Sequence, residues 1–143
     1  MSRFQVRILA ADRPFYEGEC ESLIVPTVAG QYGILAHHRN TISAIVPGTL
    51  SYRVPGEERF RLAAVSFGMV KVENNDVLVL VDTAERPEDI DANRAQREAD
   101  QAREEMLQKH SMMEYRTAQA TLARAVNRLR VKRYYEDNAI NLK

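Results

Sequence analysis

Apolar and polar residues alternate at the start of the chain, as they do in a β-strand with one buried face. From Phe4 to Ala10 every second residue is apolar, so an extended segment places this set on one side. Further short, mainly apolar runs occur at residues 23–25, 42–46 and 77–81, and we expect the last to be a buried strand. Several short strands at this spacing indicate a sandwich or a barrel, and we favour a sandwich.

Turn-forming residues separate these segments. Proline precedes glycine at residues 47–48 and 55–56, which is the order that a type II turn favours. The segment 74–76 reads Asn-Asn-Asp, which tolerates positive φ and can join two strands. Gly30 and Gly33 are expected in a tight turn between strands, because the segment has neither the length nor the Lys-Ser/Thr ending of a phosphate-binding loop.

The distribution of glycine and proline marks a boundary. All six glycines lie at or before Gly68, all five prolines lie at or before Pro87, and residues 88–143 contain neither. Because these residues punctuate strands and break helices, we predict an all-β sandwich over residues 1–86 and helices over residues 87–143.

Two apolar seams divide the helical half. Pro87 suits the first turn of a helix, and the acids that follow it suit the positive end of the helix dipole. The first seam is Ala95, Ala99, Ala102 and Met106, and the second is Tyr115, Ala118, Leu122, Ala125 and Leu129. With a reversal within residues 108–113, they predict an antiparallel hairpin whose arms are each roughly 30–35 Å long.

Small residues make this hairpin marginal, since burying a thin alanine stripe contributes little at ~25 cal/mol per Å². Its charge is segregated as well. Residues 88–105 contain seven acids and three basic residues, whereas residues 116–133 contain six basic residues and no acid. Two interpretations stay open: the arms attract each other, or the second helix docks on an acidic surface elsewhere. Because its apolar seam is thin, the hairpin is a candidate moving part.

The totals argue against several classes of protein. Twenty basic residues balance twenty acidic ones, whereas nucleic-acid binders usually carry a basic excess. Cys20 is the single cysteine, which excludes an intrachain disulfide and a thiolate metal cluster. The start of the chain has no run of signal-peptide length, and the longest aliphatic run, 77–81, is far too short to span a membrane.

Candidate catalytic residues are few. His37, His38 and His110 show no metal-ligand spacing such as HExxH, and we expect structural or solvated roles for them. Ser66 and Cys20 lack a local nucleophile motif. The sequence therefore predicts no catalytic site, no metal site and no required cofactor.

Several short motifs nevertheless follow one another in a specific order. They are Gly30-x-x-Gly33-Ile34-Leu35-x-x-His38, Pro47-Gly48-x-Leu50, Gly68-x-Val70-x-Val72-x-Asn74-Asn75, Thr83-Ala84-Glu85, Ile90-Asp91-x-x-Arg94-Ala95 and Arg124-Ala125-x-Asn127-Arg128-Leu129. This ordered set resembles the epsilon subunit of F-type ATP synthases across essentially the whole chain. Residues 35–40 depart from the family pattern Leu-Pro-x-His-Ala-Pro, and we expect a looser loop there.

The resemblance implies a non-catalytic protein with a ten-stranded sandwich that binds the gamma subunit and the c-ring of the rotor. It also implies a regulatory hairpin that either folds down or extends into the alpha/beta catalytic head, where it inhibits ATP hydrolysis. The protein would then lie peripherally on the cytoplasmic face of the cell membrane, as part of the synthase. In some members the motif at residues 90–95 binds ATP as a regulatory ligand on the folded hairpin.

A regulatory ATP site can be outlined by placing the reversal near Ser111. Arg94 then faces Arg128, and Arg124 lies near Glu98, so that three guanidinium groups converge on a space for phosphate. Ile90 and Ala95 are expected to offer an apolar surface nearby for the adenine. The full set of candidate residues is Glu85, Ile90, Asp91, Arg94, Ala95, Arg124 and Arg128. A purely structural interpretation makes Ile90 and Ala95 core residues and pairs Asp91 with Arg94.

Two other functions remain open from the residues alone. One is a nucleic-acid-binding module that uses the basic helix over residues 116–133, although phosphate contacts usually come with a net positive charge. The other is a stand-alone domain that binds a small ligand. Failure to associate with gamma and the c-ring would favour these alternatives.

Overall fold

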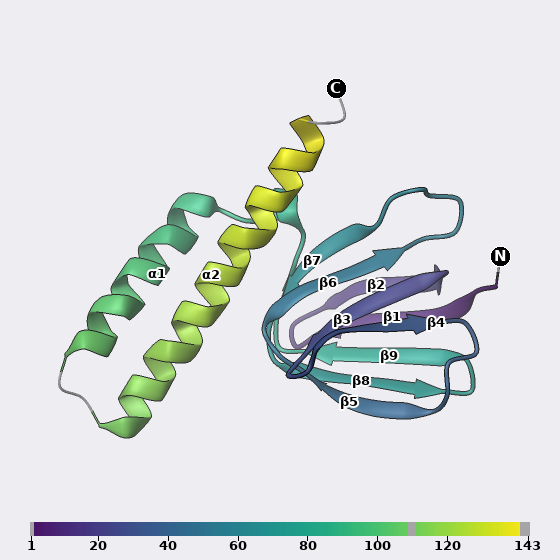
Figure 1. Ribbon diagram of the computed structural model, residues 1–143, viewed down its shortest axis with the longest axis horizontal. Coiled ribbons are helices and arrows are strands. Elements are labelled where there is room, and N and C mark those ends of the chain that lie inside the picture. Colours follow the sequence, from purple (N-terminus) through teal and green to yellow (C-terminus); the bar gives the residue numbers. More distant parts are fainter. Residues whose placement is uncertain (1, 109–110, 141–143) are drawn as a thin grey trace. The chain divides into compact units, whose positions relative to one another are not determined.

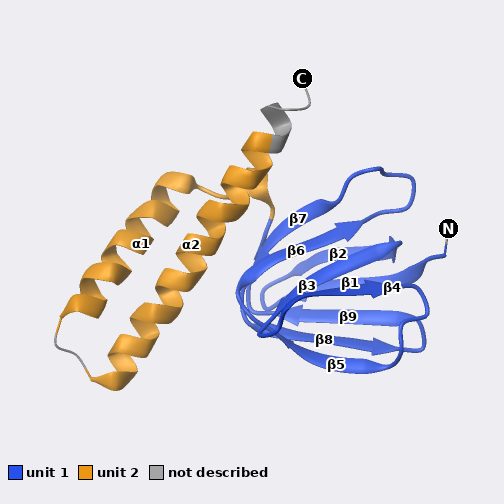
Figure 2. Ribbon diagram, viewed as in Figure 1, with its two compact units in different colours: residues 1–85 blue, residues 86–143 orange. Residues whose placement is uncertain are grey.

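A computed structural model describes residues 2–108 and 111–140 (Figure 1). The chain divides into two compact units, residues 1–85 and 86–143, which are taken separately below (Figure 2). Within its described residues, the first unit consists of ten strands. These are β1 (Phe4–Ala10), β2 (Pro14–Cys20), β3 (Ser22–Thr27), β4 (Gly30–Leu35), β5 (Thr41–Ile45), β6 (Gly48–Arg53), β7 (Arg61–Val65), β8 (Gly68–Glu73), β9 (Asp76–Val81) and β10 (Ala84–Glu85).

The strands form two five-stranded sheets, with the orders β2-β1-β9-β8-β5 and β10-β7-β6-β3-β4. β1 and β9 run parallel, from the pair Gln5 and Asp76 to the pair Ala10 and Val81, while the other described pairings are antiparallel. The predicted ten-stranded sandwich is therefore confirmed.

The core lies between the inner faces of the two sheets. Alternate residues of β1 are buried, as the sequence pattern predicted. Ile8, Leu23 and Leu50 are among the side chains with no exposed surface, and each such side chain contributes ~1.5–3 kcal/mol when it is buried. The buried strand expected at residues 77–81 is β9, and its burial is confined to one face, because Val79 faces the core while Leu80 is 38% exposed on the outer face.

Asparagines close the hairpin between β8 and β9. Asn74 has φ 50° and Asn75 has φ 65°, the left-handed conformations that a two-residue hairpin turn requires. The turn predicted at residues 74–76 is confirmed. Gly56 also has positive φ, at 88°, as expected of the turn at residues 55–56.

The other glycine predictions need correction. Gly48 does not lie in a type II turn but begins β6, where a Cβ atom would lie 2.6 Å from Cβ of Pro26. Glycine at this position therefore permits close packing rather than a turn. Gly30 has φ 115° next to the turn between β3 and β4, but Gly33 lies within β4 itself.

The loop over residues 36–40 is well tied to the sandwich, so the expectation of a looser loop is wrong. The backbone N–H of His37 donates to Oδ1 of Asn75 at 2.7 Å, and that of Asn74 donates to Oδ1 of Asn40 at 3.0 Å. The imidazole of His38 bonds to the Tyr32 hydroxyl at 3.0 Å.

The second unit is a helical hairpin, with its two helices side by side in Figure 1. A short 3-10 helix, η1 (Pro87–Asp89), precedes α1 (Ala92–Leu107), and α2 (Met112–Ile140) follows. Pro87 therefore begins η1 and not the long helix, because the extended backbone of Ile90 and Asp91 separates the two. The arms are also unequal: 16 residues give ~24 Å for α1, and 29 residues give ~43 Å for α2.

The alanine seam predicted for α1 is confirmed. Ala95 and Ala99 have no exposed surface, and Ala118 and Ala125 on α2 are buried as well. The second seam differs in part, because Tyr115 is 39% exposed. Further along the same helix Asn127 and Val131 are buried, and the apolar pattern did not single them out.

In the parts of the chain that the structure describes, no helix is both long enough and apolar enough to cross a bilayer.

Candidate functional site

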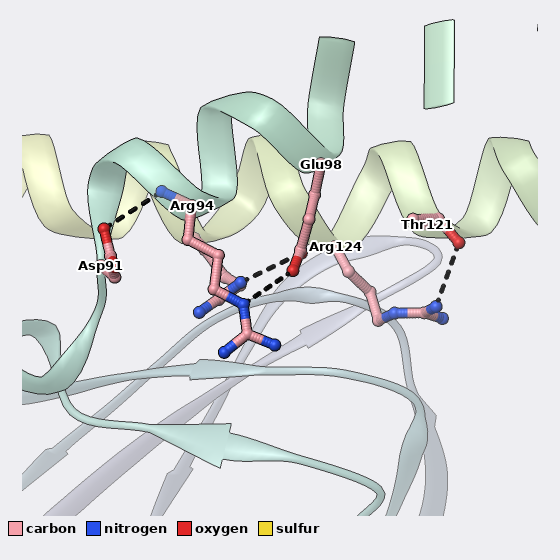
Figure 3. Close-up of polar contacts among 6 residues, drawn as sticks. Asp91, Arg94, Glu98, Thr121 and Arg124 are labelled. Carbon is pink, nitrogen blue, oxygen red and sulfur yellow. Dashed lines mark hydrogen bonds and ion pairs between the residues drawn. The ribbon is translucent and has the colours of Figure 1, made fainter. Parts of the chain in front are cut away.

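The first turn of α1 is fixed by its capping residue. Oδ1 of Asp91 accepts a hydrogen bond of 3.1 Å from the backbone N–H of Arg94 (Figure 3). This bond holds the pKa of the Asp91 carboxyl below its usual range. Asp91 is thus the N-cap of α1. Its carboxylate accepts from the backbone of Arg94 and does not form the side-chain pair that the structural interpretation assumed.

Two arginines from different helices meet at one carboxylate. Nε of Arg94 lies 3.1 Å from Oε1 of Glu98, one helical turn further along α1. Nη1 of Arg128, on α2, lies 3.2 Å from Oε2 of the same Glu98. The predicted neighbourhood of Arg94 and Arg128 is therefore present, with a carboxylate between the two guanidinium groups.

The third predicted arginine is directed elsewhere. Nη2 of Arg124 donates to the Thr121 hydroxyl at 3.4 Å, and Figure 3 shows this guanidinium turned away from the Glu98 carboxylate. The structure brings together two of the three guanidinium groups.

The remaining predicted residues do not add an open apolar surface. Ile90 is 3% exposed and Ala95 is fully buried, which matches the structural interpretation that both are core residues. Neither side chain can receive an aromatic ring in this conformation. Glu85 ends β10 and belongs to the first unit, where it pairs with Ala64.

The sequence did not predict two polar contacts within the helical unit. One is the ion pair between Glu98 and Arg128, which are 30 positions apart in sequence. The other ion pair of Glu98, with Arg94, follows from their i,i+4 spacing. Lys132 donates from Nζ to the backbone carbonyl of Pro87 at 3.1 Å, which ties α2 to η1. No local pattern signals a bond to a backbone carbonyl so far away in sequence.

The two side chains that were considered as nucleophiles, Ser66 and Cys20, are both buried. Ser66 is buried, and its hydroxyl accepts a hydrogen bond from the backbone N–H of Thr83. Cys20 is buried, and burial raises the pKa of its thiol to about 12, which leaves almost no reactive thiolate at neutral pH. Among the described residues no cluster of His, Cys, Asp and Glu could hold a metal ion, while His110 lies outside them.

Both units match protein-family models, in chain order. Residues 3–87 match the β-sandwich domain of the ATP synthase delta/epsilon chain. Residues 88–133 match its long α-helix domain.

Curated relatives match over nearly their whole length. The ATP synthase epsilon chain of Ruminiclostridium cellulolyticum is 39% identical over 129 residues, covering 90% of this chain and 95% of that protein. That of Caldanaerobacter subterraneus is 38% identical over 135 residues, covering 94% and 96%.

Solved structures share the fold. A chain of the Euglena gracilis mitochondrial ATP synthase has a TM-score of 0.75 at 19% identity, covering 86% of this chain and 77% of its own. A chain from the central stalk and c-ring of the Tetrahymena thermophila mitochondrial ATP synthase has a TM-score of 0.62 at 12% identity, covering 90% and 95%.

Proposed function

The chain belongs to the family of ATP synthase epsilon chains, and from this membership we propose that it is a non-catalytic subunit of the central stalk. Its sandwich binds the gamma subunit and the c-ring, and the complex holds it peripherally at the cytoplasmic face of the cell membrane. The observation that carries the proposal is the ordered match of both domains to this family. A nucleic-acid-binding role and a stand-alone ligand-binding role have no comparable support.

The test of assembly is co-purification with gamma and the c-ring, followed by size-exclusion chromatography. We expect the full chain and a chain truncated after Glu85 to enter the same complex, because the sandwich is a compact unit of its own. A full chain that stays free of both partners would refute the central-stalk assignment. Loss of proton-coupled ATP synthesis with the truncated chain would refute the assignment of coupling to the sandwich.

The hairpin is the regulatory part in this proposal. Its interior is a thin alanine seam, supplemented by the Glu98–Arg128 and Lys132–Pro87 links, so little free energy separates the closed form from an open one. The opened α2 reaches the alpha/beta catalytic head and inhibits ATP hydrolysis through its basic face. Arg130 and Arg133 are exposed on α2 and are available for such docking.

Neutralising Arg130 and Arg133 together tests this docking. Lys132 is left intact, because its bond to Pro87 belongs to the closed hairpin. We expect a higher rate of ATP hydrolysis by the reconstituted synthase at low ATP, since ion pairs between partly buried surfaces are lost. An unchanged rate would mean that these arginines are only a solvated face.

ATP is the ligand that we propose for the closed hairpin. Arg94 and Arg128 already lie within reach of one anion, and Arg124 can turn towards them from the same face of α2. Guanidinium groups form strong, charge-assisted hydrogen bonds with phosphate oxygens. Binding to the closed form alone stabilises it by on the order of 2.7 kcal/mol at a hundredfold excess over Kd. High ATP then favours the closed, permissive form.

Calorimetry on the full chain tests the ATP site. Wild type is expected to bind ATP, whereas Arg94→Ala and the double variant Arg124→Ala with Arg128→Ala bind it much more weakly. Arg97→Ala serves as a matched control, because Arg97 lies on the same helix and has an exposed side chain. No binding at millimolar ATP, or equal binding by the arginine variants, would show that these residues are not a nucleotide site.

A further inference from the structure

An anion of the protein's own occupies the centre of the candidate site. Each oxygen of the Glu98 carboxylate accepts a hydrogen bond from a different guanidinium group, one on α1 and one on α2. A phosphate group bound between Arg94 and Arg128 would use the same donors, because carboxylate and phosphate oxygens both accept hydrogen bonds from arginine. Glu98 therefore stands where a phosphate oxygen would be recognised.

Burial strengthens one of the two ion pairs that Glu98 forms. The Arg128 side chain is only 16% exposed, and Glu98 is 36% exposed, so their pair is screened less than an ion pair in bulk water. Arg94 is 68% exposed and contributes less. The less exposed of the two ion pairs, Glu98 with Arg128, is thus the one that joins α1 to α2.

We propose that Glu98 is an internal competitor of the nucleotide phosphates. It holds Arg94 and Arg128 in the ligand-free hairpin, and it gives up at least one of them when phosphate binds. This inference rests on the proposed ATP site and deepens it. Glu98 closes the hairpin without ATP, and it also weakens ATP binding, so one carboxylate sets the ATP concentration at which the ligand controls the hairpin.

The test compares Glu98→Gln with Glu104→Gln in the full chain. Both substitutions remove one negative charge from α1, but Glu104 is exposed and the matched control leaves the bridge in place. Glutamine keeps the size of Glu98 and retains one acceptor oxygen. In calorimetry we expect Glu98→Gln to bind ATP up to about fivefold more tightly than Glu104→Gln, because an ion pair with Arg128 no longer competes with the phosphate.

The outcomes separate the two proposals. If wild type binds ATP and Glu98→Gln binds no more tightly than Glu104→Gln, the competition is refuted while the site stands. If Glu98→Gln binds and wild type does not, the competition is supported strongly. If no variant binds millimolar ATP, both the site and the competition are overturned.

Melting temperatures provide a second test, which remains informative if Glu98→Gln loosens the hairpin. We expect the ligand-free Glu98→Gln protein to melt at a lower temperature than Glu104→Gln, and ATP to raise its melting temperature by more, because tighter binding gives greater stabilisation. An equal or smaller rise would refute the competition. Inorganic tripolyphosphate should show the same preference for Glu98→Gln, and a preference confined to ATP would refute the assignment to phosphate.

Discussion

The ammonium group of Lys132 on α2 donates a hydrogen bond of 3.1 Å to the backbone carbonyl of Pro87, at the start of the helical unit. Its side chain is only 19% exposed and also lies 4.0 Å from a carboxylate oxygen of Glu136. The long helix is thereby tied to the segment that precedes α1. This link and the Glu98 bridge fasten the hairpin at two different levels.

Replacing Lys132 by methionine should loosen the beginning of the helical unit. The methionine keeps the packing of the stem but leaves the Pro87 carbonyl without this donor, which costs about 1 kcal/mol. Hydrogen exchange at the backbone amides of residues 89–95 is expected to accelerate. Arg133→Met is the matched control, since Arg133 is exposed. Equal exchange in both variants would contradict a fastening role for Lys132.

Enlarging Ala99 should force the two helices apart. Ala99 has no exposed surface, and a leucine at this position overfills the alanine seam at a cost of about 1–3 kcal/mol. Thermal unfolding followed by helical circular dichroism should show an earlier loss of helix. Ala123→Leu, on an exposed position of α2, should leave the transition almost unchanged. If Ala99→Leu and Ala123→Leu unfold at the same temperature, the alanine seam is not tightly packed.

Gly68→Ala should destabilise the sandwich. An added Cβ atom would lie 1.9 Å from the backbone carbonyl oxygen of Leu80, in the neighbouring strand β9. Backbone cannot move aside as a flexible side chain does, so we expect a loss of at least about 1–3 kcal/mol in chemical denaturation. Gly33→Ala is the control, because a Cβ atom there meets nothing within 4 Å. Similar losses of stability in Gly68→Ala and Gly33→Ala would show that the backbone relieves the clash between the added Cβ atom and the Leu80 carbonyl oxygen.

Acid should weaken the start of α1. The hydrogen bond from the Arg94 backbone lowers the pKa of Asp91 below its ordinary value of 3.8. A lowered pKa means that this stabilisation is complete above the ordinary pKa and disappears as the pH falls through the lowered one. Relative to Asp91→Asn, the wild-type melting temperature should fall over roughly pH 5 to pH 2. A constant difference between the two proteins would exclude the carboxylate as the titrating group.

Local patterns predicted those parts of the molecule that short-range geometry controls. The alternation from Phe4 to Ala10 required only a strand with one buried face, and Asn74-Asn75 required only positive φ. The unequal arms of the hairpin could not be predicted, because residues 88–143 contain no glycine or proline to mark where a helix ends. The start of α1 was misplaced because Pro87 suits a first turn of either helix type.

The candidate site shows the same division. The pair Arg94 and Glu98 follows from helical spacing, whereas the contact of Glu98 with Arg128 depends on how α1 and α2 are aligned. Placing the reversal near Ser111 was accurate enough to bring Arg94 and Arg128 together. It could not give the rotamer of Arg124, which depends on the hydroxyl of Thr121.

The parallel pairing of β1 with β9 sets an order of events during synthesis. β9 is the central strand of its sheet, so β1 and β2 emerge from the ribosome long before the strand that joins them to β8 and β5. Until residue 81 has emerged, this half of the sandwich exposes an unpaired strand edge and its apolar face. The helical unit is made afterwards, and its two helices are neighbours in sequence. A nascent chain arrested before β9 should therefore bind chaperones, and one arrested after β10 should be released from them.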